Sequence, residues 1–207
     1  MGIIKDKKIK IVQQDERSRA RDPDSLVAAL TDADPTARRW AARDLADFPA
    51  MASALAERLT LEPEASVREA LLLSLTQIGN RVAVEGLLAG LRSDDAALRN
   101  EASEALKDLP DAVAPLMSDV LTDPDPDVRI FAVNVLESLR HPDVEQWLIQ
   151  VISTDTHVNV CATAVDLLGE VGTTAAVSAL QSLKARFPEE PYIHFAIDLA
   201  LKRIHED

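Results

Sequence analysis

The chain has 207 residues and is 47% hydrophobic but only 3% aromatic, so its core must be built mainly from Leu, Val, Ile and Ala. Its formal net charge of −13 repels phosphate backbones and anionic lipid, which argues against nucleic-acid binding and favours basic partners. No apolar run reaches the roughly 18 residues of a transmembrane segment, no secretory signal begins the sequence, and the lone Cys161 cannot form an internal disulfide, so we expect a reduced, cytoplasmic protein.

Residues 1–22 form a predicted basic arm that precedes the patterned part of the chain. They carry seven basic and four acidic side chains, which leaves the remaining residues with a net charge of −16. Isoleucines are interspersed with lysines in "IIKDKKIKIV", residues 3–12, but a lone strand is not stable. Three interpretations remain open for this arm: a disordered segment, a cap over the first repeat near Trp40, or a peptide that docks on another protein.

Residues 23–207 form a predicted repeat domain. Apolar anchor residues recur 30 to 33 residues apart, at Ala37, Val67, Leu98, Val128, Val160 and Ile193. The positions 4, 8 and 11 residues after each anchor are also apolar, which places them on one stripe of a helix. We therefore expect six such helices, each of them the second helix of a repeat.

A shorter apolar pattern comes before each anchor and predicts the first helix of the repeat. Pairs of apolar residues four apart mark five of these helices: Leu26 and Leu30, Leu55 and Leu59, Leu87 and Leu91, Met117 and Leu121, Leu148 and Ile152. Segments such as "DPDPD" separate the two patterns, because Pro stops one helix or opens the next and Asp supplies an N-cap. The sixth repeat has a longer first helix and the unusual turn "RFPEEPY", so we interpret it as a terminal cap.

The segments "DPDPDVRIFAV", "EPEASVREALL", "ALLLSLTQIG" and "AVDLLGEVG" resemble the HEAT-repeat family, and most closely the bacterial HEAT-like repeats of phycobilisome lyases. The resemblance covers roughly residues 23–205. It implies an all-α fold, a right-handed α-solenoid of six helical-hairpin repeats, whose second helices line a concave side. It says little about function, since the family includes many unrelated binding proteins.

An arginine follows the anchor in four repeats and an acid lies four residues before it. The pairs are Asp34 and Arg38, Glu64 and Arg68, Asp95 and Arg99, and Asp125 and Arg129. In the family such residues resemble a ladder that ties successive turns together, and we favour that interpretation over a row of ligand-binding arginines. The fifth and sixth repeats have Cys161 and His194 in the arginine position.

Motifs of catalysis are not found, so we expect no enzyme activity, no catalytic residue and no bound cofactor. The sequence has no phosphate loop, GxSxG, CxxC or HExxH pattern. His157 and Cys161 have the spacing of metal ligands on a helix, but two ligands do not make a site. The single His-Glu pair in "IHED" falls short of the several pairs that deoxyhypusine hydroxylase, an enzyme of HEAT-like repeats, brings to one cavity.

Positions 2, 3, 6 and 10 after each anchor point away from the core stripe and form a candidate protein-binding surface. We assign to it Trp40, Glu69, Leu73, Glu101, Glu104, Asp108, Ile130, Phe131, Asn134, Asp166 and Glu170. The structural alternative is a solvated charged face whose aromatic side chains pack between repeats.

The functional interpretation is a non-catalytic scaffold or adaptor whose acidic concave face binds a basic or basic-apolar segment of another protein. A lyase-like protein or a cofactor or assembly chaperone of the phycobilin-lyase type is the alternative, and the sequence leaves the oligomeric state open.

Overall fold

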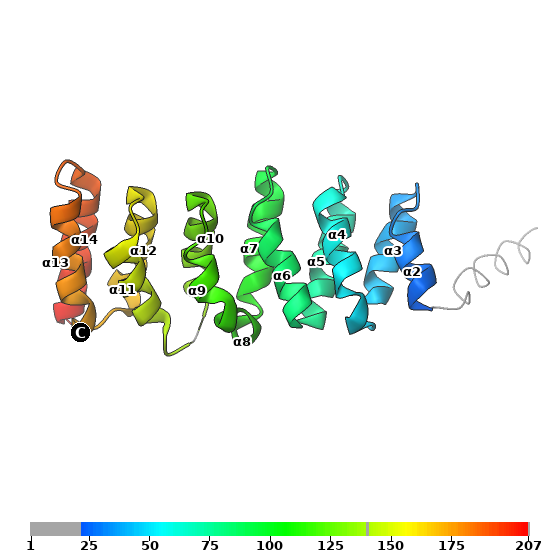
Figure 1. The fold of residues 1–207 in the computed structure, drawn as a ribbon, viewed down its shortest axis with the longest axis horizontal. Coiled ribbons are helices and arrows are strands. Elements are labelled where there is room, and N and C mark those ends of the chain that lie inside the picture. Colours follow the sequence, from blue (N-terminus) through cyan, green and yellow to red (C-terminus); the bar gives the residue numbers. More distant parts are fainter. Residues whose placement is uncertain (1–21, 140, 207) are drawn as a thin grey trace, which may run out of the picture. The chain divides into compact units, whose positions relative to one another are not determined.

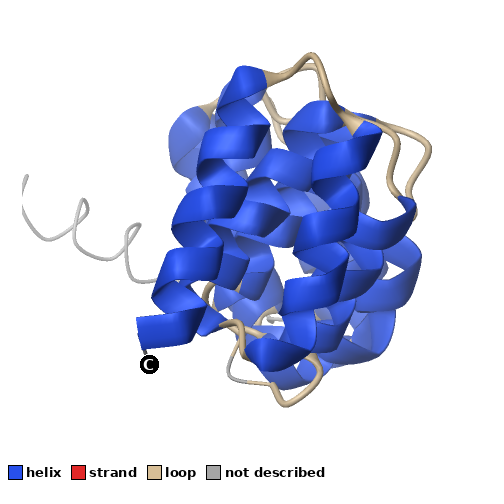
Figure 2. Cartoon of the chain, turned by 90° about the vertical axis from the view of Figure 1, so that its left-hand side faces the viewer, coloured by secondary structure: helices blue, strands red, loops and turns tan. Residues whose placement is uncertain are grey.

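A computed structural model of the chain describes residues 22–139 and 141–206. These residues form helices joined by short turns, and no strand occurs among them, as Figures 1 and 2 show. The predicted arm lies outside the described residues except for Asp22. The helices group into two compact units, Met1–Ile78 (unit 1) and Gly79–Asp207 (unit 2).

Unit 1 contains two helical hairpins. Its elements are α2 (Pro23–Ala29), α3 (Pro35–Leu45), the 3-10 helix η1 (Pro49–Met51), α4 (Ala52–Leu61) and α5 (Ala65–Ile78). Asp22 and Asp34 are the N-caps of α2 and α3, and each is followed by a proline at the first helical position. This placement suits proline, because a backbone N–H in the first turn of a helix would have no intrahelical partner and proline has no N–H to leave unpaired. Helix α3 packs on α5, so the two hairpins of unit 1 stack through their second helices.

Unit 2 contains the other four hairpins. Its elements are α6 (Arg81–Gly90), α7 (Ala96–Lys107), α8 (Pro110–Val113), η2 (Ala114–Leu116), α9 (Met117–Val120), α10 (Pro126–Leu136), α11 (Val144–Thr154), α12 (Val158–Val171), η3 (Thr174–Ala176), α13 (Val177–Arg186) and α14 (Pro191–Glu206). The second helices pack in chain order, α7 on α10, α10 on α12 and α12 on α14. The predicted all-α fold of repeated hairpins, the α-solenoid class, is confirmed.

The predicted core stripe is buried along the middle of the second helices, except that Leu201 in α14 is half-buried. The positions 4 residues after the anchors are all buried, from Ala41 in α3 to Ile197 in α14. The last position of the stripe is less regular, because it lies where each helix ends and its packing partners thin out. Phe48 is half-buried, and Val171, the last residue of α12, has 44% of its surface exposed. The assignment of Val171 to the core is therefore wrong.

The fourth repeat departs from the regular first helix that the Met117 and Leu121 pair predicts. Here the chain forms α8, η2 and α9 in succession instead of one continuous helix. Pro115 lies inside η2, and proline has no N–H to donate and its ring clashes with the preceding turn. Met117 and Leu121 are nevertheless both buried, so they contribute to the core although the helix is interrupted.

Candidate protein-binding surface

The arginine position of the first repeat is occupied by a buried ion pair between two hairpins. Arg38 donates from Nε to Oε2 of Glu62 at 2.8 Å and from Nη2 to Oε1 at 2.7 Å. Arg58 donates to the same Oε2 at 2.9 Å from Nε and at 2.6 Å from Nη2. Burial alone would raise the pKa of Glu62, but these hydrogen bonds from Arg38 and Arg58 hold that pKa at about 2. Both arginine side chains are thereby committed to structure.

The fourth repeat uses the same arrangement. Arg129 donates from Nε to Oδ2 of Asp155 at 2.6 Å and from Nη2 to Oδ1 at 3.0 Å, so α10 is tied to the turn that precedes α12. Asp155 also accepts from the backbone N–H of His157 at 2.8 Å. Burial acts to raise the pKa of Asp155, but the hydrogen bonds, led by those from Arg129, bring it below its usual range. The inter-repeat ladder thus exists, although its acids are not those predicted.

The acids four residues before the arginines serve as helix caps. Asp34, Asp95 and Asp125 each accept from the backbone N–H two residues further on, at 2.8 to 2.9 Å. The acid that pairs with Arg38 or Arg129 is instead the first residue of the next hairpin's turn. The predicted pairings of Asp34 with Arg38 and of Asp125 with Arg129 are therefore corrected, because an N-cap carboxylate is directed at the helix backbone.

The side chain at the arginine position also closes its own turn in successive repeats. The guanidinium groups of Arg38, Arg68, Arg99 and Arg129 each donate to the backbone carbonyl six residues earlier in the chain. The Sγ of Cys161 lies 3.4 Å from the corresponding carbonyl of Asp155. Cys161 therefore takes over the turn-closing role of the arginines. Burial and the nearby Asp155 carboxylate raise the pKa of its thiol to about 11.

In unit 1 the candidate surface consists of residues on α3 and α5. Trp40 and Leu73 have 55% and 56% of their surface exposed, and Glu69 is exposed as well. The guanidinium carbon of Arg43 lies 5.8 Å from the centroid of a Trp40 ring, a cation–π distance. This part of the surface is apolar and of mixed charge, so the predicted acidic character does not extend over it.

In unit 2 the candidate surface follows three neighbouring second helices, and we call its members the second-helix row. The row comprises Glu101, Glu104 and Asp108 on α7, Ile130, Phe131 and Asn134 on α10, and Asp166 and Glu170 on α12. Most of its acids are exposed, whereas the three α10 members and Glu101 are half-buried. Lys107 contacts Glu104 at 2.9 Å, an exposed pair that adds little stability. Acidic side chains therefore flank a partly apolar middle.

Sequence reasoning missed the continuation of this row on α14. Tyr192, Phe195 and Leu199 are exposed there by 62%, 67% and 39%. Phe195 and Leu199 lie 2 and 6 residues after the anchor Ile193, so the rule used for the other repeats would have found them. The hydroxyl of Tyr192 lies 3.4 Å from Oδ2 of Asp166, which places α14 beside the acidic part of the row.

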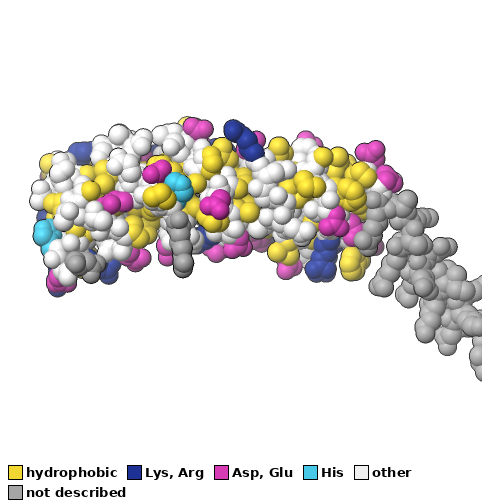
Figure 3. Space-filling view, turned by 90° about the horizontal axis from the view of Figure 1, so that it is seen from below, with side chains coloured by type: hydrophobic (Ala, Val, Ile, Leu, Met, Phe, Trp, Pro, Cys, Tyr) yellow, Lys and Arg dark blue, Asp and Glu magenta, His cyan; other side chains and the backbone are white. Residues whose placement is uncertain are grey.

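The surface of the described residues mixes apolar and acidic groups. A space-filling view from below shows Asp and Glu side chains distributed among hydrophobic ones (Figure 3). No helix within residues 22–139 and 141–206 combines the length and the apolarity needed to cross a bilayer. In the same part of the chain, no group of three His, Cys, Asp or Glu side chains is placed to hold a metal ion.

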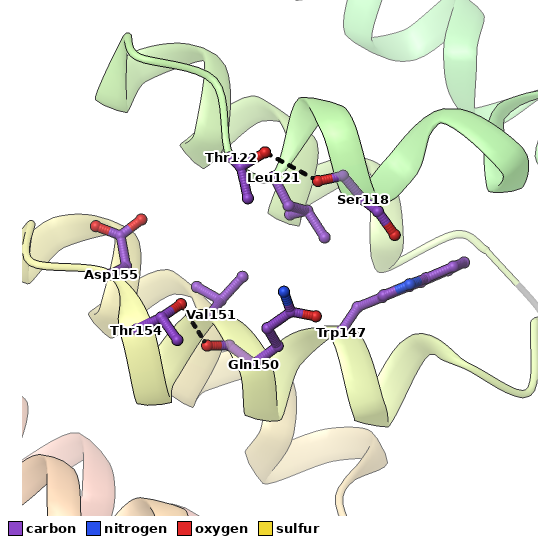
Figure 4. A pocket seen from close by; sticks show the side chains of 8 residues that line it. All are labelled: Ser118, Leu121, Thr122, Trp147, Gln150, Val151, Thr154 and Asp155. Carbon is purple, nitrogen blue, oxygen red and sulfur yellow. Dashed lines mark hydrogen bonds between the residues drawn. The ribbon is translucent and has the colours of Figure 1, made fainter.

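A small cavity lies between the first helices of the fourth and fifth repeats. It has a volume of about 20 Å³, room for about one water molecule. Its lining is Ser118, Leu121, Thr122, Trp147, Gln150, Val151, Thr154 and Asp155. The Thr122 and Thr154 hydroxyls donate to carbonyls one turn earlier in their own helices, as Figure 4 shows. Such a cavity is too small for an organic cofactor.

Comparison with known proteins agrees with this architecture. Residues 23–112 and 113–193 match the family model described as HEAT repeats. Drosophila melanogaster Mini spindles TOG3 is similar with a TM-score of 0.54 at 16% identity, over 86% of this chain and 92% of that one. Human deoxyhypusine hydroxylase is similar with a TM-score of 0.47 at 18% identity, over 90% of this chain and 76% of that one. The CpcE–CpcF complex of phycocyanin lyase from Nostoc is similar with a TM-score of 0.34 at 21% identity, over 88% of this chain and 94% of that one. No curated protein sequence matches the chain.

Proposed function

Because the chain belongs to the HEAT-repeat family, we propose that it is a non-catalytic protein-binding scaffold that holds a basic or basic-apolar segment of another protein. The observation that carries the proposal is the second-helix row of unit 2, where exposed acids flank Ile130 and Phe131. Opposite charge accelerates encounter, and desolvated apolar groups keep the partner bound. The arginines that would have suited an anionic ligand are engaged within the hairpin turns, which further favours a basic partner.

The lyase-like or cofactor-chaperone alternative has less support. The cavity between α9 and α11 has a volume of about 20 Å³ and Asp155 as the one carboxylate in its lining, whereas a tetrapyrrole needs a site of several hundred Å³. The buried Cys161 is consistent with a reducing compartment, so we extend the proposal to the cytoplasm. Copurification of a pigment or cofactor with the native protein would favour the alternative.

The test is affinity purification from the native cell followed by binding measurements with the recovered partner. Reversing Glu101 and Glu104 to Lys should weaken the complex and reduce its dependence on salt. The matched control reverses Asp111 and Asp119 to Lys, two exposed acids on the first helices of unit 2, and changes the net charge equally. Equal effects of the two double variants would show that overall charge, not the second-helix row, attracts the partner.

The chain's own residues 3–12 are the other predicted source of a basic segment, and they lie outside the described residues. Removing residues 1–21 keeps Asp22, the N-cap of α2, and so leaves the first helix intact. Loss of partner binding after this removal would mean that the arm itself docks on the partner. Retained binding supports recognition by the repeats.

A further inference from the structure

Each second helix has one edge that contacts the repeat before it, and we call this edge, three and seven residues after the anchor, the leading edge. Position 7 is buried in α5, α10, α12 and α14, where it is Ser74, Val135, Leu167 and Ala200. The hydroxyl of Ser74 donates to the carbonyl of Ala42 in the preceding second helix, α3, at 2.8 Å. The Cα of Ala200 lies 3.4 Å from where a β-carbon of Gly169 in α12 would be. The leading edge therefore normally packs on the preceding second helix.

The leading edge of α3 is only partly covered, since no second helix precedes α3 among the described residues. Its position 3 is Trp40, with 55% of its surface exposed. The matching residues of α5, α10, α12 and α14 are buried or half-buried, among them the small Ala70 and Ala196. The anchor of α3, Ala37, is half-buried, although the other five anchors are buried. An indole thus lies exposed on the edge that normally contacts a preceding repeat.

Helix α2 is also poorly covered. None of its residues is buried, and Leu26 and Val27 are half-buried. The first helix of the next repeat, α4, buries Ala52, Leu55 and Leu59. The end repeats of a solenoid need a cap, because each repeat buries its apolar sides only against its neighbours. In the described part of the chain, nothing takes the place of that neighbour for the first hairpin.

We propose that residues 3–12 of this chain pack on the leading edge of α3 and cover Trp40, in the place that a preceding repeat would occupy. These residues include four isoleucines and a valine, whereas Ala20 is the one apolar residue of the link that follows, residues 13–21. Ten residues separate residue 12 from the start of α2 and span up to about 33 Å when extended. Helix α2 rises only about 10 Å, and packed helix axes lie about 9 Å apart, so Trp40 is within reach.

Charge and connectivity favour this occupant. Residues 1–22 carry seven basic and four acidic side chains, whereas the first repeat, residues 23–48, carries five acidic and three basic ones. Alternate residues of an extended segment share a face, so Ile9 and Ile11 can lie on the indole while the lysines between and beside them stay in water. The link holds the segment at an effective concentration of about millimolar, which favours it over a second copy of the chain.

Tryptophan fluorescence tests the proposal, because Trp40 and Trp147 are the only tryptophans of the chain. In Trp147→Phe, acrylamide quenching reports on Trp40 alone. Deleting residues 1–21 in this background should raise the quenching constant several-fold and shift the emission to longer wavelength. Ile9→Ser/Ile11→Ser should have the same effect, whereas the control Gln13→Ser/Gln14→Ser, in the link, should have none. In Trp40→Phe, which reports on the buried Trp147 of unit 2, the deletion should change nothing.

Equal quenching of Trp40 with and without residues 1–21 would overturn the proposal, and so would a full effect of the deletion that Ile9→Ser/Ile11→Ser does not reproduce. Protection of Trp40 that falls on dilution of the full chain would assign the leading edge of α3 to a second copy instead.

Hydrogen exchange followed by mass spectrometry needs no tryptophan substitution. Deleting residues 1–21 should speed exchange in α2 and α3 and leave α12 and α14 unchanged. Unchanged exchange in α2 and α3, or faster exchange throughout the chain, would contradict a local cap. The second-helix row lies in unit 2, so either result leaves the proposed function standing.

Discussion

Arg38 and Glu62 are 24 residues apart in sequence, yet the guanidinium of Arg38 donates to both carboxylate oxygens of Glu62 at 2.7 and 2.8 Å. The Glu62 side chain has no exposed surface, and Arg58 supplies its second cationic partner. Glu62 also accepts from the backbone N–H of Glu64 at 3.0 Å, so one carboxylate fixes its own turn and binds the preceding hairpin. Removal of such a carboxylate leaves buried charge unpaired, which is more costly than the net value of the pair.

The first prediction concerns the acid stability of unit 1. The folded-state pKa of Glu62 is about 2, below the usual glutamate value of 4.5, so its contribution to the free energy of unfolding is complete above pH 4.5 and is lost as the pH falls towards 2. A depression of this size corresponds to about 3 kcal/mol. Glu62→Gln should therefore lower the free energy of unfolding at pH 7 by about that amount and flatten its decline between pH 4.5 and 2. Urea unfolding at several pH values measures both effects.

Glu64→Gln is the matched control for this experiment, because Glu64 is exposed in the same turn. It should change the free energy of unfolding at pH 7 by less than about 0.5 kcal/mol. If the difference between wild type and Glu62→Gln stayed constant from pH 7 to pH 2.5, titration of Glu62 would not be the cause of the stabilisation.

The sequence was sufficient to predict the hairpins, because each second helix repeats its apolar stripe with helical spacing. Leu136 and Leu168 show why the prediction succeeds: burial of such a position depends on its own helix and on the neighbouring repeats, both of which follow the same pattern. Val171 shows where it fails, since periodicity cannot tell that a helix ends there and that the position loses its packing partners. Pro115 carried a signal against a regular first helix in the fourth repeat.

The ladder could be predicted only in part. An acid four residues before an arginine has the spacing of a helical ion pair, and the same spacing arises when the acid is an N-cap. Asp34 illustrates the second case. The true partners, Glu62 and Asp155, lie 24 to 26 residues downstream of their arginines, so they become evident only when adjacent hairpins are stacked. The position of Phe195 was visible in the pattern, but its exposure depended on the packing of α14.

The second prediction tests the helical register of α10. Leu136 has 1% of its surface exposed in the core, whereas Asn134 is half-buried in the second-helix row. Leu136→Ala should cost about 2–5 kcal/mol through lost burial and a residual cavity. Asn134→Ala should cost less than about 0.5 kcal/mol. Urea denaturation compares the two, and similar costs would show that the register is wrong.

The third prediction compares two arginines of the ladder. Arg129 makes a two-pronged contact with Asp155, whose side chain is only 5% exposed, so Arg129→Ala should cost about 3–5 kcal/mol. Arg99 donates to the carbonyl of Ser93 at 2.6 Å, but its buried Nε has no hydrogen-bond partner, so Arg99→Ala should cost less. Thermal unfolding ranks the variants. In Arg129→Ala/Asp155→Ala the loss should fall well short of the sum of the single losses, and additivity would exclude coupling between the two residues.

The fourth prediction concerns the reactivity of Cys161. Its thiol is buried and its pKa is raised to about 11, so the reactive thiolate is scarce at pH 8. We expect modification by a thiol-specific disulfide reagent to be slow in the native protein and fast in denaturing urea. The reaction should follow the opening of the fifth repeat, and Leu168→Ala, which weakens the packing of α12, should accelerate it. Rapid modification of the folded wild type would contradict the burial of Cys161.

The last prediction separates attraction from retention in the proposed complex. On α7 Glu104 is exposed and Glu101 is half-buried, whereas Phe131 is half-buried on the next second helix of unit 2. Long-range charge acts before contact, so Glu101→Lys/Glu104→Lys should lower the association rate constant several-fold and flatten its dependence on salt. An apolar anchor acts after contact, so Phe131→Ala should leave association within about twofold and raise the dissociation rate constant about tenfold. Surface plasmon resonance with the purified native partner at 50 and 300 mM salt measures both constants.

Two substitutions on the first helices are the controls: Asp119→Lys for the charge reversal and Val82→Ala for Phe131→Ala. If Phe131→Ala and the charge reversal left both rate constants unchanged, the second-helix row could not be the binding surface, because neither its charge nor its apolar middle would contribute to the complex.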